Sequence, residues 1–171
     1  MAEGGRLSLG NPAAPVSIVE FTDFHCPYCS RGAQTLKEVM KKYDGQVRLV
    51  VRHFPLSGHP AAMPAALYFE AIGLQNPAAA WKFYDALFAD QEKLSGGEDY
   101  LKKVAENLDL NMERLAKDLE NEKIKARIAA DMRAFETSRF DGVPVFVVNG
   151  TVLIGAQPAE ALEAAIQDAL K

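Results

Sequence analysis

The sequence has few cysteines and no long apolar segment, and each shortage limits what the protein can be. Cysteine occurs only twice in 171 residues, so the chain can form at most one internal disulfide. No run of 18 apolar residues is present, and we therefore expect no membrane-spanning segment. The 19 Lys and Arg are outnumbered by 23 Asp and Glu, which leaves a net charge of −4. This balance argues against a nucleic-acid partner, which calls for a basic face.

The N-terminus also lacks a recognisable leader. The first ten residues, MAEGGRLSLG, contain no apolar core of a signal peptide, and we expect residues 1–5 to be an artificial start or a trimmed mature end. Residues 1–15 are small and polar, which predicts a flexible segment with at most a short edge strand at 6–9. With 49% hydrophobic residues, the length predicts one domain, with or without an inserted subdomain, and a substantial core.

The two cysteines, Cys26 and Cys29, form a Cys-x-x-Cys motif between a strand pattern and a helix pattern. Residues 16–21 read VSIVEF, a β-branched, apolar run typical of a buried strand. From Ser30 onwards, apolar residues recur three and four positions apart, as they do on one face of a helix. The motif is therefore predicted to lie at a strand-to-helix turn, with Cys26 at or near the first residue of the helix.

A helix N-terminus gives Cys26 a specific chemistry. Unpaired backbone N–H groups and the positive end of the helix dipole stabilise an anion there. Such a setting can lower a cysteine pKa from ~8.5 to roughly 3.5–7.5. Pro27 suits the first helical turn because it has no N–H to leave unpaired. We expect Cys26 to be the outer, attacking thiol and Cys29 the inner, resolving thiol, and the pair to cycle between disulfide and dithiol.

Two other uses of the cysteines stay open. A structural disulfide is one, although a ring that closes so short a loop adds little stability. A zinc site is the other, with both cysteines and two of His25, His53 and His59 as ligands. A single Cys-x-x-Cys supplies only half of such a site. Redox chemistry, which needs no metal, is the interpretation that we favour.

The remaining patterns give the order of the elements. A β-branched strand at 47–54 completes a right-handed βαβ unit with parallel strands. Residues 60–139 carry helical patterns throughout, which predicts an all-helical insertion. Strands at 143–148 and 151–154 flank Asn149-Gly150, a strong signal for a tight hairpin turn, and a last helix begins at Pro158.

In this order of elements the chain resembles the DsbA-like thiol:disulfide oxidoreductases. The resemblance covers nearly the whole chain and rests on the runs LGNPAAPVSIVEFTDFHCPYC and GVPVFVVNG, and on G-A-Q-P at the start of the last helix. It implies an α/β protein with a thioredoxin fold, in which a βαβ half and a ββα half surround a central mixed sheet and a helical subdomain is inserted between them. The expected segments are the N-terminal segment 1–15, the first half 16–59, the helical insertion 60–139 and the second half 140–171.

The resemblance also implies which residues form the site. Cys26 and Cys29 match the catalytic pair of the family. Val143 and Pro144 match a loop with a cis proline, which lies beside the active cysteines and presents its backbone to an extended segment of the substrate. These four residues are therefore the predicted core of the site.

Glu20 lies six residues before Cys26, where the family has a buried acid beneath the redox pair. An acid on a buried strand is costly unless it has a partner or a task. The functional hypothesis is that Glu20 relays a proton to or from Cys29. The alternative is a strand-edge carboxylate that lies in solvent or pairs with Arg52.

Three residues around Cys26 are candidates for tuning its redox potential. Pro27 and Tyr28 occupy the two positions that do so in the family, and they read Pro-Tyr where the best-known strong oxidants have Pro-His. This departure removes one source of thiolate stabilisation. His25, directly before Cys26, is a candidate to replace it, or else an exposed turn residue.

The resemblance implies an enzyme that exchanges its disulfide with protein or peptide thiols, and we expect an exported oxidase that introduces disulfides. We expect a monomer without a cofactor, in a periplasmic or otherwise extracytoplasmic location. A redox partner, such as a membrane protein, would recycle the cysteine pair. The alternatives are a thiol reductase or isomerase with the same residues, a cytoplasmic location, and a non-enzymatic module that binds peptides.

Overall fold

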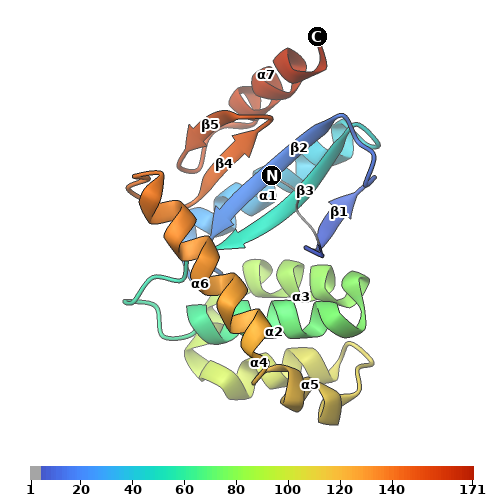
Figure 1. The fold of residues 1–171 in the computed structure, drawn as a ribbon, viewed down its shortest axis with the longest axis vertical. Coiled ribbons are helices and arrows are strands. Elements are labelled where there is room, and N and C mark those ends of the chain that lie inside the picture. Colours follow the sequence, from blue (N-terminus) through green and yellow to red (C-terminus); the bar gives the residue numbers. More distant parts are fainter. Residues whose placement is uncertain (1–4) are drawn as a thin grey trace.

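The strands of the protein meet in one mixed sheet at its centre (Figure 1). The computed structural model describes residues 5–171, and within them the strand order is β1-β3-β2-β4-β5. β2 and β3 run parallel, as the βαβ pattern predicts, whereas the other three neighbouring pairs are antiparallel. The strands are β1 (Ser8–Gly10), β2 (Val16–Thr22), β3 (Val47–His53), β4 (Val145–Val148) and β5 (Thr151–Ile154).

The hairpin of β4 and β5 shows how the sequence sets the register of the sheet. Asn149 and Gly150 have φ angles of 42° and 90°, the left-handed conformations that a tight two-residue turn requires. They bring Val148 opposite Thr151, and the predicted hairpin is confirmed. β4 begins two residues later than predicted, because Pro144 has no N–H with which to join a strand ladder.

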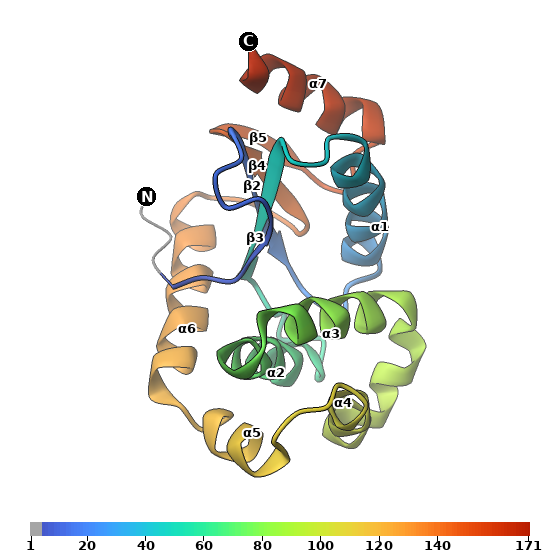
Figure 2. The same ribbon diagram turned by 90° about the vertical axis from the view of Figure 1, so that its right-hand side faces the viewer.

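Helices cover both faces of the sheet and one of its ends. α1 and α7 lie on one face and α6 on the other, while α2 to α5 pack beyond the end at which β2 and β3 finish (Figure 2). The helical character predicted for 60–139 is confirmed, although a short 3₁₀ helix was not expected. The helices are α1 (Pro27–Lys42), α2 (Ala62–Gln75), α3 (Pro77–Ala89), η1 (Gln91–Gly96, 3₁₀), α4 (Gly97–Glu106), α5 (Met112–Asp118), α6 (Glu122–Thr137) and α7 (Ala159–Leu170).

We call α2 to α5, with η1, the helical block. α6 connects this block to the sheet, because Phe135 of α6 packs edge-on against Phe21 of β2 at 5.7 Å between ring centroids. Asp131, one turn earlier, binds Arg52 of β3 at 3.0 Å. The predicted insertion 60–139 thus includes one helix that covers the sheet. The predicted segment boundaries at 15, 59 and 139 remain predictions.

An aromatic cluster fixes the end of β2 to the helical block. Phe24 is 1% exposed, and burial of a side chain of this size stabilises the fold by ~1.5–3 kcal/mol. The turn that carries the cysteines is therefore held where sheet and block meet. The ring of Phe24 lies 5.1 to 6.5 Å from those of His53, Phe69, Phe83, Tyr84 and Phe88.

Candidate redox site

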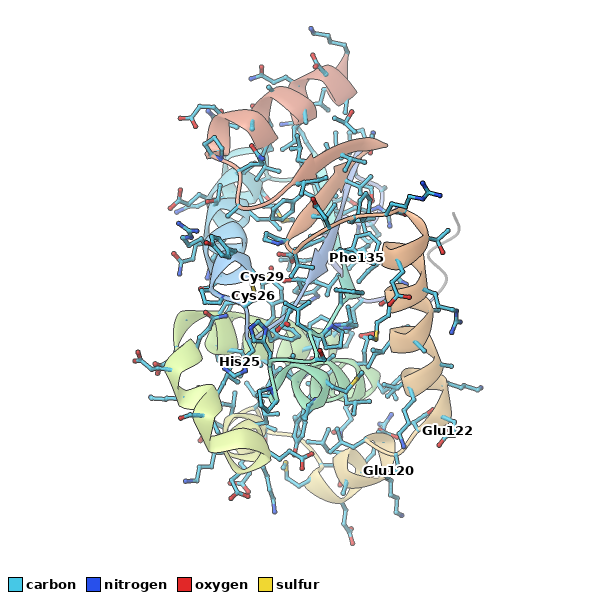
Figure 3. The ribbon with its side chains drawn as sticks, turned by 90° about the vertical axis from the view of Figure 1, so that its left-hand side faces the viewer. His25, Cys26, Cys29, Glu120, Glu122 and Phe135 are labelled. Carbon is cyan, nitrogen blue, oxygen red and sulfur yellow. The ribbon has the colours of Figure 1, made fainter. Side chains whose placement is uncertain are left out.

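The Cys-x-x-Cys motif lies at the predicted strand-to-helix turn. β2 ends at Thr22, and α1 begins at Pro27 with Cys26 as its N-cap residue, in an extended conformation (φ −83°, ψ 124°). Figure 3 shows His25, Cys26 and Cys29 at the junction of the sheet layer and the helical block, with Phe135 on the opposite side of the sheet. The local sequence thus places the first cysteine where the N–H groups of a helix begin.

Cys26 has the environment of a reactive thiol. It is 6% exposed, whereas Cys29 is fully buried, and both thiols are free. The Cys29 thiol, which donates a hydrogen bond to Cys26, lowers the pKa of Cys26 to about 6, and the backbone N–H groups of Cys29 and Tyr28 contribute, against the opposing effect of burial. The lowered pKa agrees with the helix-terminus argument, although the largest cause is the second cysteine. At neutral pH, Cys26 is mainly a thiolate.

Cys29 has the opposite character. Burial raises its pKa, and so does the hydrogen bond that it donates to Cys26. Cys29 therefore keeps its proton when Cys26 has lost its own. This asymmetry suits an attacking outer thiol and a resolving inner thiol, the order that the sequence predicts.

Glu20, two residues before the end of β2, is completely buried. The Tyr84 hydroxyl donates a hydrogen bond of 2.7 Å to its Oε1, while Oε2 has no hydrogen-bond partner among residues 5–171. Burial raises the pKa of Glu20 to about 7, against the lowering effect of Tyr84. The alternative of an exposed carboxylate paired with Arg52 is wrong, because Arg52 binds Asp131 on the other side of the sheet. Sequence reasoning did not identify Tyr84 as the partner of Glu20, because Tyr84 lies on α3, 64 residues further along the chain.

Asp23 organises the turn before Cys26. Its buried carboxylate accepts hydrogen bonds from the N–H groups of His25 (2.7 Å) and Leu56 (2.9 Å), and it pairs with Nδ1 of His59 at 2.8 Å. The His25 and His59 rings lie 5.2 Å apart. The loop that follows β3 is thereby tied to the redox turn. Tuning by His25 remains a prediction, and the contact of His59 with the site was not foreseen.

Pro27 and Tyr28 form the outer surface beside Cys26. Tyr28 is 58% exposed, and the guanidinium of Arg31 lies 4.7 Å from the centre of its ring. Such a cation–π contact at an exposed position is worth about 0.5–1 kcal/mol. Both residues of the Pro-Tyr dipeptide are therefore accessible to a bound substrate, and their tuning role remains a prediction.

The loop of Val143 and Pro144 packs against α1 close to the cysteines. The peptide bond between them is cis, the isomer that the family resemblance implies. A Cβ atom on Gly32, three residues after Cys29, would lie 3.0 Å from Cγ of Pro144. The missing side chain of Gly32 thus allows the loop to approach the helix, a role that the sequence pattern did not reveal.

The helical block contributes two further contacts that sequence reasoning missed. The Gln91 side-chain amide donates hydrogen bonds to the carbonyl oxygens of Phe24 (2.8 Å) and Cys26 (2.9 Å). The Ser30 hydroxyl donates to the carbonyl of Phe88 at 2.8 Å. Because these bonds join residues 58 to 67 positions apart, no local pattern marks them.

Two features are absent from residues 5–171 of the structure. In that part of the chain, no three His, Cys, Asp or Glu side chains gather as ligands of a metal ion would. None of its helices combines the length and the apolar character needed to cross a membrane.

Comparison with known proteins places this site in a family. Residues 2–168 match the family model described as Thioredoxin. The probable disulfide bond formation protein D of Bacillus cereus is 32% identical over 155 residues, which cover 86% of this chain and 71% of that protein. The Na(+)/H(+) antiporter NhaA 3 of Salinispora tropica is 39% identical over 161 residues, which cover 94% of this chain but 24% of the antiporter. The chain thus spans about a quarter of the length of the antiporter relatives.

Solved structures agree with the family match. A thioredoxin-like oxidoreductase from Silicibacter pomeroyi superposes with a TM-score of 0.83 at 32% identity, over 95% of this chain and 91% of that one. The thiol-disulfide exchange protein α-DsbA2 from Wolbachia pipientis, at 17% identity, shares the fold with a TM-score of 0.84 over 97% and 88% of the two chains. The fold of this chain is that of DsbA-like thiol:disulfide oxidoreductases, and the chain belongs to the thioredoxin family.

Proposed function

We propose that the protein is an oxidase that introduces disulfides into other proteins outside the cytoplasm. The observation that carries the proposal is the unequal environment of the two cysteines: Cys26 is stabilised as a thiolate, with a pKa of about 6, while burial keeps Cys29 protonated. Stabilising the reduced pair makes the disulfide a stronger oxidant. The name of the Bacillus cereus relative, a disulfide bond formation protein, supports the same direction.

The exchange takes place in two steps. A substrate thiolate attacks the Cys26 sulfur of the Cys26–Cys29 disulfide, and Cys29 leaves with the electron pair and takes up a proton. A second substrate thiolate attacks the substrate sulfur of this mixed disulfide, and Cys26 leaves as the thiolate. Its low pKa makes Cys26 the better leaving group. Two substrate thiols are oxidised to one disulfide, and the enzyme's disulfide is reduced.

Glu20 is the proposed source of the proton for Cys29. With a pKa of about 7, its carboxyl group can both give and accept a proton at neutral pH, as general acid–base catalysis requires. Burial is the largest cause of the raised pKa of the Tyr84 hydroxyl, and its closeness to Glu20 and, more weakly, to Cys29 adds to it. Tyr84 is thus close enough to respond to both groups, which supports a proton path between them.

The substrate is proposed to be an extended protein segment that carries a cysteine. It would lie along the backbone of Val143 and Pro144, next to α1, and contact the exposed ring of Tyr28. A membrane-bound redox partner would reoxidise the pair, and the protein would act as a monomer. The Pro-Tyr dipeptide, without the histidine of the strong oxidants, favours a reductase as the second candidate.

A direct test mixes the oxidised protein with a reduced, unfolded protein that contains several cysteines. The oxidase proposal predicts stoichiometric transfer of the disulfide to the substrate, measured by thiol alkylation and mass spectrometry. With a substrate that already carries disulfides, the Cys26 thiolate of Cys29→Ser should attack one of them and accumulate as a mixed disulfide with release of the other substrate thiolate, and Cys26→Ser should form none. If the disulfide stays on the enzyme while the reduced enzyme cleaves substrate disulfides, the protein is a reductase. If neither transfer occurs, it is not an exchange enzyme.

A further inference from the structure

Gln91 of the helical block forms hydrogen bonds with the backbone of the redox turn. This residue is the first of η1, and one residue separates it from the end of α3. Its Nε2 carries two hydrogens, and it donates to two acceptors, the carbonyls of Phe24 at 2.8 Å and of Cys26 at 2.9 Å. These carbonyls flank His25, so the amide spans the stretch that leads into the catalytic cysteine.

Within residues 5–171, the other hydrogen bonds of the Cys26 backbone go to residues three and four positions away in the chain. The N–H of Cys26 donates to the carbonyl of Asp23 at 3.1 Å, and the carbonyl of Cys26 accepts the first helical bond, from the N–H of Ser30, at 3.1 Å. Gln91 adds a second donor to that same carbonyl from 65 residues away. It thereby fixes the orientation of the N-cap residue relative to the helical block.

We infer that Gln91 is a positioning residue of the redox site, which holds Cys26 so that the N–H groups of Tyr28 and Cys29 face its sulfur. Two effects follow from the geometry. The amide fixes the direction of the first helical turn, on which stabilisation of an anion by backbone N–H groups depends. It also joins the carbonyl of Phe24 to that of Cys26, and so holds the backbone on both sides of His25 in one arrangement.

Neighbouring contacts of the same segment support this role. Within eight residues, 84–91, the block donates from Tyr84 to Glu20, accepts from Ser30 at the carbonyl of Phe88, and donates from Gln91 to the turn. The segment therefore contacts the redox site below the cysteines, beside them and at the turn before them. A merely covering helix would not need polar contacts at all three places.

The inference rests on the proposed exchange function, and it is tested on the equilibrium of the cysteine pair. Gln91→Met keeps the length of the side chain and removes both donors. Gln75→Met is the matched control, because Gln75 also makes two hydrogen bonds to backbone, with the carbonyl and N–H of Asn111 at 2.9 and 3.0 Å, between α2 and α5. Both variants are equilibrated in glutathione buffers, and the Cys26 pKa is read from thiolate absorbance.

Gln91→Met should make the pair less oxidising by about threefold to tenfold in its equilibrium constant with glutathione, which is up to ~30 mV, and raise the Cys26 pKa above its wild-type value. Gln75→Met should change the equilibrium constant with glutathione by less than about twofold and leave the Cys26 pKa at its wild-type value. Gln91→Ala serves as a second variant if the thioether packs badly. Unchanged potential and pKa in both Gln91 variants, or an equal shift in the control, would overturn the inference. A wild-type protein without exchange activity would instead refute the proposed function.

Discussion

Two carboxylates are completely buried on opposite faces of the same sheet, and their surroundings differ sharply. Asp131 of α6 accepts hydrogen bonds from the guanidinium groups of Arg6 and Arg52 and from the N–H of His53. Glu20 of β2 accepts one hydrogen bond, from Tyr84, and its Oε2 has no partner in the described part of the chain. One carboxylate is saturated with donors, and the other is not.

The difference teaches that burial alone does not mark a functional acid. A buried charge with several charged and neutral donors is a structural tie, here between the N-terminal segment, β3 and α6. A buried carboxyl group with one neutral donor has a raised pKa and can exchange its proton near neutral pH. The two residues can be separated experimentally, because one should govern stability and the other the chemistry.

The largest effect is expected at the saturated carboxylate. Asp131→Asn leaves Arg6 and Arg52 without their anionic partner, and breaking a buried pair typically costs 3–5 kcal/mol. The free energy of unfolding, from urea titration, should fall by about that amount, while exchange activity per folded molecule stays unchanged. Asp85→Asn, which removes an exposed partner of Lys37, is the control and should cause no comparable loss. If Asp131→Asn abolished exchange in the folded protein, the comparison would fail.

The second effect is the pH dependence of stability that comes from Glu20. Its pKa rises from 4.5 to about 7 on folding, so between these values the folded protein holds a proton that the unfolded chain has lost. The stabilising contribution is complete below pH 4.5 and is lost as the pH rises through 7, on the order of 3 kcal/mol in total. Glu20→Gln should remove this dependence. The stability of the variant relative to the wild type should therefore be higher at pH 8 than at pH 4. A parallel pH profile of the two proteins would contradict the assignment.

The same variant has a kinetic consequence that Asp131→Asn lacks. Without a titratable group beneath the pair, the step in which Cys29 leaves or attacks should slow by roughly tenfold or more. Rapid-mixing measurements of mixed-disulfide formation and decay would resolve this step. Unchanged rates for Glu20→Gln would remove Glu20 from the mechanism.

The smallest effect sharpens the role of the single donor. Tyr84→Phe removes the hydrogen bond that lowers the Glu20 pKa, so this pKa should rise further, by about one unit. The pH profile of the Cys29 step should move to higher pH by the same amount. Tyr43→Phe is the control, because the Tyr43 hydroxyl accepts a hydrogen bond from the Gln167 amide at the far end of α1, and the pH profile of this variant should match that of the wild type. If the pH profile shifted equally in both variants, the cause would instead be a non-specific destabilisation of the fold.

The sequence patterns predicted the structural features that depend on residues close together in the chain. The Cys-x-x-Cys motif at a helix N-cap follows from a β-branched run, Pro27 and a helical stripe. The hairpin follows from Asn149-Gly150, and the helical insertion from its periodicity. Each of these signals lies within a few residues of the structure that it specifies, because strand, turn and helix preferences are local.

Partners from distant parts of the chain could not be predicted in this way. Tyr84 on Glu20, Gln91 on the turn and Arg6 on Asp131 join positions 64 to 125 residues apart, and single polar residues on helices carry no signal of what they face. The family resemblance identified Glu20 and Pro144, but it did not say which side chain accompanies the acid. The pairing of Arg52 with Glu20 was a wrong alternative because neighbouring strand positions place their side chains on opposite faces.

The most direct test of the central claim is the equilibrium reduction potential of the Cys26–Cys29 pair in glutathione buffers, with the Cys26 pKa measured on the same protein. The account predicts a potential well above that of thioredoxin, ~−270 mV, towards the ~−120 mV of strong oxidants, together with a pKa of about 6. A potential near ~−270 mV with a pKa of ~7 or higher would contradict it. Electrons would then flow from the protein to its substrates, and the same two cysteines would serve a reductase.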